Sequence, residues 1–296
     1  MISLPAPAKL NLYLHVTGKR EDGYHLLDSL VAFAAVHDTV SVEETSDLGL
    51  TSTGPFGGQL GNDQDNLVMQ AANRLREMTG VSRGARITLI KRLPVASGIG
   101  GGSADAAAAI KALVRLWDIH PGQHDLSGLA LSLGADVPIC LFGQAAFMGG
   151  IGEDIDPAGD LPDVPVVLVN PGVDVPTPSV FKARAAAFSP ARRFTETPET
   201  IRQLIHLLND GRDNDLMVPA LSLEPAIGEV ISSLSASGDC RFARMSGSGA
   251  TCFGFFSDME KAGTAADSIA KENPDWWVTA TRLVSDTRTL TADTTV

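Results

Sequence analysis

Apolar and polar residues alternate along two short segments in the first hundred residues. Segments 38–43 and 86–91 each place aliphatic side chains at alternate positions, which is the period of a strand with one buried face. Between them, segment 66–78 carries apolar residues at helical spacing and predicts an amphipathic helix. Segment 103–117 is rich in alanine, a strong helix former, and predicts a second helix. The first third of the chain therefore alternates strand, helix, strand, helix.

The rest of the chain follows no regular alternation. A short helix is predicted over 124–133, ending at Gly134, since glycine commonly follows a helix. Segment 149–163 is rich in glycine, proline and acidic residues, and we expect it to link two domains, 1–158 and 159–296. Strands are predicted over 164–169, 242–246, 251–256 and 276–284. This irregular order favours an α+β fold over a doubly wound sheet.

Composition is that of an ordinary globular chain, with 44% of the 296 residues hydrophobic and 20% charged. The net charge of −12 repels polyanions, so we expect no nucleic-acid partner. No apolar run predicts a membrane span, and the first residues lack the pattern of a signal peptide. The three cysteines form no CxxC pair, which is typical of reduced thiols. We therefore expect a cytoplasmic protein, either a monomer or a weak homodimer.

The strand over 86–91 leads directly into a loop with four glycines, Gly98, Gly100, Gly101 and Gly102. Inside a strand or helix each glycine costs roughly 0.5–1 kcal/mol relative to alanine, so this density indicates a loop that needs glycine. A helix is predicted immediately after the loop, and the free N–H groups at a helix start bind phosphate. A phosphate-binding loop is one reading, and a flexible turn without a ligand is the alternative.

The amino-acid sequence of this loop excludes two familiar phosphate-binding motifs. A P-loop requires GxxxxGK[ST], but the only Gly-Lys pair, Gly18-Lys19, is followed by Arg20. The dinucleotide fingerprint GxGxxG fails because Ser103 stands where its third glycine should be. The loop instead reads Pro-x3-Gly-x-Gly-Gly-Gly-Ser, beginning at Pro94.

Further motifs accompany the loop along the chain. They are Pro7-Ala8-Lys9-Leu10-Asn11-Leu12, Arg20-Glu21-Asp22-Gly23-Tyr24-His25, Gly134-Ala135-Asp136-Val137-Pro138, Pro171-Gly172-x3-Pro176-Thr177 and Met245-Ser246-Gly247-Ser248-Gly249-Ala250-Thr251. In this order the motifs resemble those of the GHMP kinases, a superfamily that includes galacto-, homoserine, mevalonate and phosphomevalonate kinases. The resemblance runs from about residue 5 to residue 284. It implies a two-domain α+β fold, with an N-terminal domain like ribosomal protein S5 and a ferredoxin-like C-terminal domain.

The resemblance implies a kinase that uses ATP, with Mg²⁺ arriving mainly with the nucleotide. The residues expected to contact ATP are Asn66, Pro94, Val95, Ala96, Ser97, Gly98, Ile99, Gly100, Gly101, Gly102, Ser103 and Ala104. Asn66 is otherwise a helix cap, and Ser103 is a cap, a hydroxyl near the phosphates and Mg²⁺, or both. The sequence departs from the common family pattern at Ala104, where many members have a second serine, and at Ala96-Ser97, where glycine is common.

By resemblance, Asp136 corresponds to the proposed general base for the acceptor hydroxyl. Taken alone, an Asp-x-Pro sequence more often marks a capped turn. Lys9 is otherwise a surface lysine, but the resemblance places it beside Asp136, where it keeps the carboxylate ionised and offsets developing charge. Asn11 is expected to orient the acceptor. These three residues are the predicted centre of the chemistry.

A second group of residues is predicted to bind the acceptor. By resemblance, Tyr24 and His25 contact a cytosine base, through stacking and a hydrogen bond to the base edge. Phe181 is either the opposite stacking face or an ordinary core residue. Thr177 is expected to line the acceptor pocket. Gly247 and Ser248 are either a hairpin turn or, as in the family, a loop that holds the phosphates of the substrate or ATP.

The branch of the superfamily with these motifs phosphorylates the 2-hydroxyl of 4-diphosphocytidyl-2-C-methyl-D-erythritol, a step of non-mevalonate isoprenoid synthesis. The resemblance implies the same reaction for this chain. One alternative is a GHMP kinase for another acceptor such as mevalonate or homoserine, but these acceptors carry no base for Tyr24 and His25. The other alternative is a sensor that binds nucleotide without turnover, which the presence of both Lys9 and Asp136 argues against.

Overall fold

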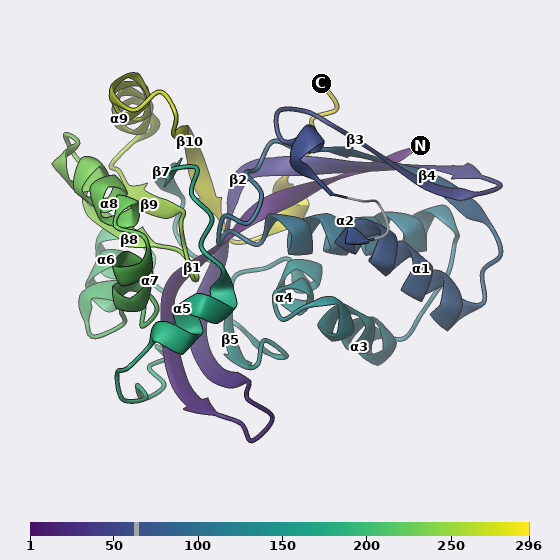
Figure 1. The fold of residues 1–296 in the computed structure, drawn as a ribbon, viewed down its shortest axis with the longest axis horizontal. Helices are drawn as coiled ribbons and strands as arrows, with labels where there is room; N and C mark the ends of the chain where they lie inside the picture. The colour runs from purple at the N-terminus through teal and green to yellow at the C-terminus, as the bar shows by residue number, and fades with distance from the viewer. Residues whose placement is uncertain (62–64, 296) are drawn as a thin grey trace.

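Ten strands form one mixed sheet in the part of the chain that the structure describes, residues 1–61 and 65–295. In this computed structural model the main path of the sheet is β3-β4-β2-β10-β7-β9-β8, while β1 and β5 pair with β2, and β6 pairs with β5. The strands are β1 (Ile2–Lys19), β2 (His25–Thr45), β3 (Leu48–Thr53), β4 (Gly84–Ile90), β5 (Ala146–Gly150), β6 (Asp154–Pro157), β7 (Val164–Asn170), β8 (Phe242–Met245), β9 (Cys252–Phe255) and β10 (Trp277–Val284). Figure 1 shows that the sheet runs through two lobes.

The two longest strands, β1 and β2, form an antiparallel hairpin through the centre of the molecule (Figure 1). β1 is not among the strands predicted from the sequence. Its residues 6–16 are all buried, although apolar and polar residues alternate from Ala8 to Val16, which is a strand signal. Pro5 and Pro7 weaken this signal at the start of the strand, because proline is rare inside sheets except on strands with a free edge. β1 pairs with β2 alone, and this leaves an edge where proline is tolerated.

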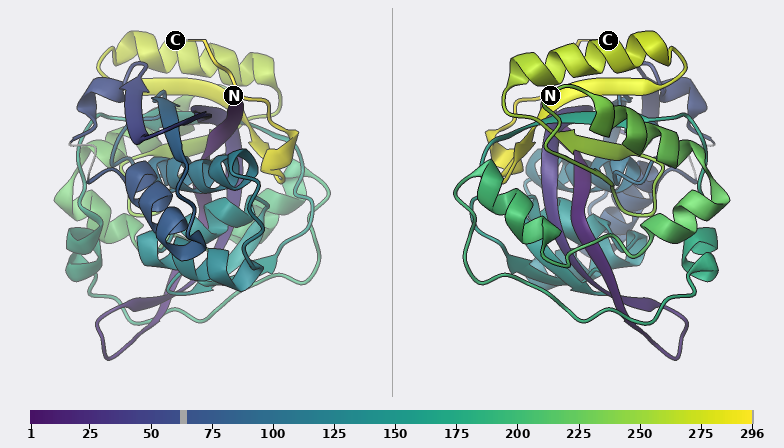
Figure 2. Two further views of the ribbon diagram at one scale, coloured as in Figure 1. Left: turned by 90° about the vertical axis from the view of Figure 1, so that its right-hand side faces the viewer. Right: turned by 90° about the vertical axis from the view of Figure 1, so that its left-hand side faces the viewer.

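The N-terminal lobe places four helices on one face of the sheet around β2 and β4 (Figure 1 and the left panel of Figure 2). The helices are α1 (Leu67–Thr79), α2 (Gly101–Leu116), α3 (Gln123–Leu133) and α4 (Val137–Phe142). The strands and helices predicted for this part of the chain are confirmed, with α2 beginning two residues earlier than expected. The buried face of α1, the alanines of α2 and Trp117 fill one core with the aliphatic residues of the strands.

The C-terminal lobe packs its helices against β7, β8, β9 and β10 (Figure 1 and the right panel of Figure 2). They are α5 (Thr177–Ala183), α6 (Ile201–Asn209), α7 (Met217–Leu223), α8 (Ala226–Ala236) and α9 (Met259–Glu272). The four strands predicted for this half are confirmed to within one or two residues. β7 is buried over its whole length, which explains its unbroken apolar sequence.

The segment predicted as a linker, 149–163, is structured over about half of its length. The end of β5 and all of β6 lie within it and form an antiparallel hairpin, so only residues 158–163 connect this hairpin to β7. The prediction of one continuous linker is therefore wrong. β10 pairs with β2 and with β7, which carries the sheet from one lobe into the other. The predicted α+β class is confirmed.

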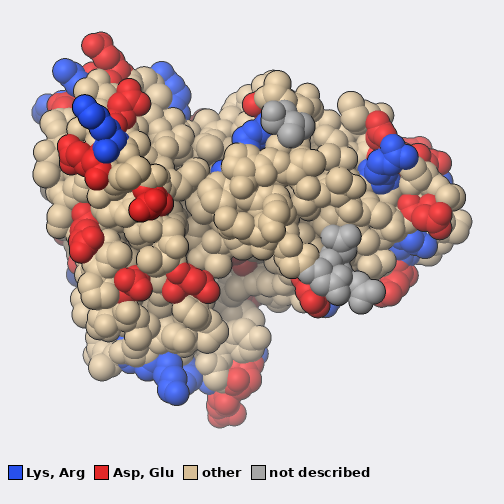
Figure 3. All heavy atoms as spheres, turned by 45° about the horizontal axis from the view of Figure 1, so that its top comes forward, with Lys and Arg blue, Asp and Glu red and all other residues tan. Residues whose placement is uncertain are grey.

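Basic and acidic side chains are mixed on the surface. On the face drawn in Figure 3, Lys and Arg atoms are scattered among Asp and Glu atoms, and they form no continuous basic area outside the atoms drawn in grey. With 35 acidic and 23 basic residues, such a surface does not favour a polyanion. Within residues 1–61 and 65–295, no helix combines the length and the apolar character that a membrane span needs.

Candidate active site

A cavity of about 610 Å³ brings together residues from the motifs that the sequence singled out, except the motif over residues 20–25. The predicted site residues that line it are Lys9, Asn11, Asn66, Pro94, Val95, Ala96, Ser97, Gly98, Gly100, Gly101, Gly102, Ser103, Asp136, Thr177, Phe181, Gly247 and Ser248. They come from β1, the glycine loop, the first turns of α1, α2 and α5, the residue before α4, and the loop between β8 and β9. One cavity therefore joins segments that lie more than 200 residues apart.

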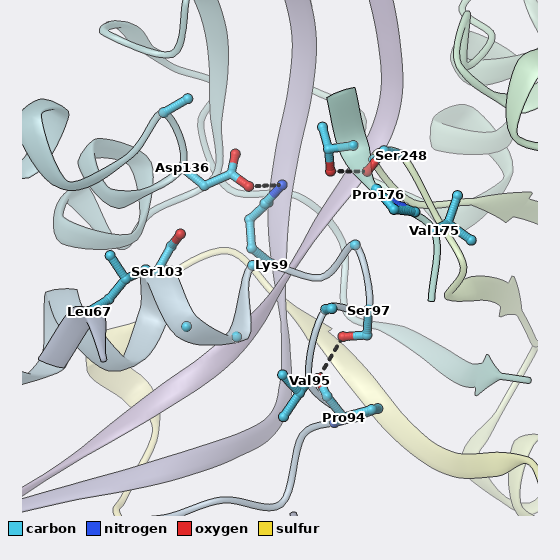
Figure 4. A pocket seen from close by; sticks show the side chains of 18 of the residues that line it. Lys9, Leu67, Pro94, Val95, Ser97, Ser103, Asp136, Val175, Pro176 and Ser248 are labelled. Atoms are coloured by element: carbon cyan, nitrogen blue, oxygen red, sulfur yellow. Dashed lines mark hydrogen bonds and ion pairs between the residues drawn. The ribbon is translucent and has the colours of Figure 1, made fainter. Parts of the chain in front are cut away.

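Lys9 and Asp136 form an ion pair in this cavity. Lys9 Nζ lies 2.9 Å from Asp136 Oδ2, and Figure 4 shows the two side chains pointing toward each other. Lys9 is 3% exposed, whereas the side chain of Asp136 is 33% exposed and stays open to a ligand. Asp136 directly precedes α4 but makes no side-chain capping hydrogen bond. The reading of Asp136 as a capped turn is therefore wrong, because its carboxylate faces Lys9.

Asn11 fixes the orientation of Lys9 through a buried chain of hydrogen bonds. Lys9 Nζ donates to Asn11 Oδ1 at 2.8 Å, and Asn11 Nδ2 donates to Ser29 Oγ at 2.8 Å. Ser29 Oγ in turn donates to the carbonyl of Tyr13 at 2.5 Å. Because these donors and acceptors are mutually satisfied, the Lys9 ammonium is held in one place. Asn11 thus acts on the site at least by positioning Lys9.

The glycine loop turns the first amides of α2 toward the cavity. Three loop residues have positive φ, namely Ala96 at 51°, Gly98 at 76° and Gly100 at 64°. The first intrahelical bond of α2 runs from Ala104 N to Gly100 O, so the amides of Gly101, Gly102 and Ser103 have no partner within the helix. Free amides at a helix start form an anion site. This arrangement favours a phosphate-binding loop, and the choice between it and a plain turn stays a prediction.

Ser103 is not the cap of α2. The residue at the cap position is Gly100, and no side chain caps the helix. Ser103 stands within the first turn, and Figure 4 places it at the edge of the cavity on the side of Lys9 away from Ser248. Of its two predicted roles, only the hydroxyl near the phosphates and Mg²⁺ remains.

The glycine loop packs directly against the loop between β8 and β9. Thr251, in the β8–β9 loop, donates its N–H to Ser97 O at 3.1 Å. On the side of β1, Lys9 N donates to Ile99 O at 2.8 Å. A side chain at Gly98 would collide with the backbone of Gly249, which explains why glycine is needed at both a positive φ and a close approach. The C-terminal glycine motif thus connects the β8–β9 hairpin and also packs on the glycine loop, and its role in holding phosphates stays a prediction.

Ser248 and Thr177 face each other across the acceptor side of the cavity. Their hydroxyls are hydrogen-bonded at 2.7 Å, the contact drawn beside Ser248 in Figure 4. Asn214 holds the loop that carries Ser248, because its Nδ2 donates to Gly247 O at 2.8 Å. The sequence gives no signal for Asn214, since a lone asparagine in a loop is ordinary.

Tyr24 and His25 have different positions although they are neighbours in the sequence. The His25 ring stacks on Phe181, with 4.8 Å between ring centroids and 20° between planes, and Phe181 lines the cavity. Burial, Lys19 and Arg184 lower the pKa of His25, which favours a neutral ring. Neither Tyr24 nor His25 lines the cavity, and Tyr24 is 59% exposed. The structure therefore joins His25 to the cavity wall through Phe181 and places Tyr24 at the surface.

Two predicted nucleotide contacts do not line the cavity. The Ile99 side chain is fully buried in the core shared by β1, β7 and β9, and Ala104 is buried in the core of the N-terminal lobe. Asn66 lines the cavity and also caps α1, because its Oδ1 accepts from Val68 N at 2.9 Å. Both readings of Asn66 thus remain open.

Sequence reasoning overlooks three charged residues behind the loop, namely Asp38, Lys91 and Asp105. Lys91 and Asp105 also line the cavity. The sequence places Asp105 in the first turns of a predicted helix, and the structure buries it among the alanines of α2. Burial raises the pKa of Asp105 to about 8, with a further contribution from Asp38. A single Asp within an alanine-rich helix is the sequence signal that could have indicated a buried partner.

Family models match two parts of the chain. One described as "GHMP kinases N terminal domain" matches residues 66–144, and one described as "GHMP kinases C terminal" matches residues 191–275. The chain is 51% identical over 283 residues to a 4-diphosphocytidyl-2-C-methyl-D-erythritol kinase of Paramagnetospirillum magneticum, covering 96% of this chain and 99% of the relative. It is also 51% identical to the kinase of that name from Rhodospirillum rubrum, covering 95% and 92%.

Solved structures agree with these relatives. A crystal structure of 4-(cytidine 5'-diphospho)-2C-methyl-D-erythritol kinase matches with a TM-score of 0.77 and 37% identity, over 96% of this chain and 99% of that one. A mevalonate kinase matches with a TM-score of 0.67 but 11% identity, over 97% and 100%, and shares the fold alone. With both family models matched and relatives similar over nearly their whole length, this chain belongs to the GHMP kinase family.

Proposed function

We propose that this chain transfers the γ-phosphoryl group of ATP to the 2-hydroxyl of 4-diphosphocytidyl-2-C-methyl-D-erythritol, in the non-mevalonate route to isoprenoid precursors. Relatives that share about half of its residues carry the name of that kinase. The observation that carries the proposal is the placement of the Lys9–Asp136 pair in the same cavity as the free amides of α2. A phosphate donor and an alcohol can meet there.

The glycine loop and the start of α2 are proposed to hold the triphosphate of ATP. The free amides of Gly101, Gly102 and Ser103 and the helix dipole supply positive potential without a basic side chain. Asn66 and the other cavity-lining residues of the loop are proposed to contact the nucleotide. A net charge of −12 is compatible with this, because the positive potential is local.

Asp136 is proposed to accept the proton of the acceptor hydroxyl as its oxygen attacks the γ-phosphorus. The exposed part of its carboxylate can reach a ligand in the cavity, which a general base requires. Lys9, 2.9 Å away, is proposed to offset the negative charge that develops on the acceptor oxygen and the moving phosphoryl group. Thr177, Gly247 and Ser248 are proposed to hold the acceptor on the other side.

The cavity suits a magnesium ion that arrives with ATP. In the described ranges 1–61 and 65–295, no group of three or more His, Cys, Asp or Glu side chains could hold a metal ion. Ser103 lines the cavity, and its hydroxyl forms no hydrogen bond with the described residues, so it is a free, hard oxygen ligand of the kind Mg²⁺ prefers. We propose that Ser103 holds the ion together with the phosphates. When bound, Mg²⁺ would neutralise charge on the β- and γ-phosphates.

The stacked pair of His25 and Phe181 is proposed as the cytosine site. A flat base can stack on either ring, and a neutral His25 can donate to or accept from the base edge. Because the two rings now touch, the base either slides against the outer face of one ring or separates them. Tyr24, being exposed at the tip of the β1–β2 turn, is proposed to close over the base only when it is bound.

Three further assignments are part of the proposal. The division into domains at residues 158 and 159 is supported by the connection 158–163, although the sheet is continuous through β10. A monomer or weak homodimer and a cytoplasmic location remain proposals, supported only by composition. Neither affects the chemistry.

An ADP-release assay with three acceptors tests this function. We expect rapid ADP release with the cytidine-linked acceptor and only background release with mevalonate or homoserine. Turnover of either of the other acceptors at a similar kcat/KM would replace the proposed acceptor. ATP binding without any turnover would favour a nucleotide sensor. The Asp136→Asn variant is the matched control for contaminating ATPase.

A further inference from the structure

The cluster of Asp38, Lys91 and Asp105 lies behind the glycine loop and has no role in the chemistry described above. Lys91 follows β4, and its ammonium donates to Asp38 Oδ2 at 2.5 Å and to Asp105 Oδ2 at 2.8 Å. The three side chains are at most 3% exposed. Buried ion pairs are weak stabilisers, because apolar residues of similar volume are often as stable. A function for the charges is therefore worth seeking.

The cluster touches both ends of the phosphate loop. Asp38 Oδ1 accepts from the backbone N–H of Arg92 at 2.5 Å and of Leu93 at 2.8 Å, the residues that lead into the loop. At the other end, a Cβ built on Gly101 would lie 3.0 Å from Lys91 Nζ. The ammonium thus lies against the first residue of α2, beside the amides that are free to bind phosphate.

Two hydrogen-bonding positions in the cluster are unused. A lysine ammonium has three donors, and only two of those of Lys91 have acceptors among the described residues. Asp105 Oδ1 is buried and likewise has no partner. Lys91 and Asp105 both line the cavity. Unsatisfied buried polar atoms are rare, and a pair of them at a cavity wall points to a ligand or to water that a ligand orders.

We propose that Lys91 is a positioning residue for the phosphates of ATP. Asp38 and Asp105 hold its ammonium behind the first turn of α2, where it fixes the loop and offsets the negative charge of the two carboxylates beside the free amides. The proposal rests on the assignment of this cavity to ATP, and it adds a side chain to a phosphate site that otherwise consists of backbone.

A buried charge acts on the phosphates more strongly than a surface lysine would, because the low dielectric of the interior screens it less. Its effect grows with the negative charge of the ligand. Loss of the ammonium should therefore weaken the binding of ATP more than that of ADP, and the binding of ADP more than that of AMP. If the cluster had a purely structural role, loss of the ammonium would weaken the binding of all three nucleotides by the same factor.

Calorimetric binding of ATP, ADP and AMP to Lys91→Met, without acceptor, tests the proposal. We expect the Kd for ATP to rise at least about 10-fold and the Kd for AMP to rise less than about 3-fold. Lys111→Met is the matched control, since Lys111, in α2, is a partly buried lysine that does not line the cavity. Its ATP affinity should stay within about 2-fold of the unchanged protein.

Equal weakening of the three nucleotides, or an ATP affinity within about 2-fold in a folded Lys91→Met, would overturn the proposal. If the lone carboxylates prevent this variant from folding, Lys91→Met combined with Asp105→Leu replaces the pair by apolar groups and should give the same ranking of nucleotides. Because no acceptor is present, these outcomes are independent of the ADP-release assay. Failure of the unchanged protein to turn over the cytidine-linked acceptor would instead contradict the proposed reaction.

Discussion

Two lysines lie against the same glycine loop, Lys9 beside Gly100 and Lys91 beside Gly101, and each is paired with carboxylate oxygens within 3 Å. Both lysines are almost fully buried, but their partners differ. Asp136 is 33% exposed and faces the cavity, whereas Asp38 and Asp105 are enclosed. The first pair can reach an acceptor and exchange a proton with it. The second can act on a ligand only through the loop and through its field. Both lysines form ion pairs, so the exposure of the partner carboxylate is what distinguishes a catalytic pair from a positioning pair.

The variant Asp136→Asn tests the difference between the two ion pairs most directly, because it keeps the shape of the side chain and removes its basicity. We expect kcat to fall by ~10²-fold or more, the usual size of a general-base effect, while ATP affinity stays unchanged. Asp163→Asn is the matched control, since Asp163 pairs with Arg282 on the surface. A kcat within a few-fold of the unchanged protein would show that Asp136 does not remove the proton.

His25→Ala tests whether His25 binds the acceptor and not ATP. Loss of one stacked ring should raise the KM for the cytidine-linked acceptor about 10-fold, because stacking of a base on an aromatic side chain is worth roughly 1–3 kcal/mol. The KM for ATP should not change. Tyr24→Ala provides the comparison, and we expect a smaller effect because Tyr24 is exposed. Equal effects of His25→Ala on both substrates would place the base site elsewhere.

Lys111 extends the comparison to a lysine that supports Asp136 from a distance. Its ammonium donates to Cys140 O at 3.1 Å, near the end of α4, the helix that Asp136 precedes. We expect Lys111→Met to lower kcat about 3-fold, within the range seen when a supporting contact is lost. An unchanged kcat in a folded variant would show that α4 holds Asp136 without this contact.

Lys111 also predicts a pH dependence of stability. Burial lowers the pKa of Lys111 to about 8, below the usual value of 10.5. Between these two values the unfolded chain binds more protons at this residue than the folded protein, so the free energy of unfolding should rise with pH. Urea unfolding from pH 7.5 to pH 10 should show this rise in the unchanged protein relative to Lys111→Met. Parallel curves for the two proteins would contradict the assigned pKa.

The smallest expected effect concerns Ala96, which lies in the glycine loop. Its φ of 51° lies in the left-handed region, which costs a residue with a Cβ roughly 1–2 kcal/mol. Glycine avoids this strain but loses more chain entropy on folding, by roughly 0.5–1 kcal/mol. We expect Ala96→Gly to stabilise the protein by about 0.5–1 kcal/mol in urea unfolding, with ATP affinity kept. A destabilised variant would mean that the methyl group makes a needed contact.

The sequence predicts the fold well where a segment carries a periodic or unbroken apolar pattern. The helices α1, α2 and α3 and most strands follow from such patterns. β1, which holds Lys9 and Asn11, alternates from Ala8 to Val16, but Pro5 and Pro7 interrupt the pattern where the strand begins. Helix α5, which presents Thr177 and Phe181, is only seven residues long and begins with two residues that also favour turns.

The candidate site divides in a similar way. The motifs identify Lys9, Asp136 and the loop amides, because their spacing along the chain is characteristic. The contacts between distant segments cannot be deduced from spacing. Neither the close approach of Gly98 to Gly249 nor the burial of Asp105 against Lys91 has a local signature, since each depends on how α2 packs on the sheet.

The phosphorylated product itself is the most direct test of the central claim. After incubation with ATP and the cytidine-linked acceptor, mass spectrometry and phosphorus NMR identify how many phosphoryl groups the acceptor gained and on which oxygen. We expect one phosphoryl group on the 2-oxygen and an equal amount of ADP. A phosphoryl group on another hydroxyl, or ADP without a phosphorylated acceptor, would contradict the geometry assigned to Lys9, Asp136 and the glycine loop.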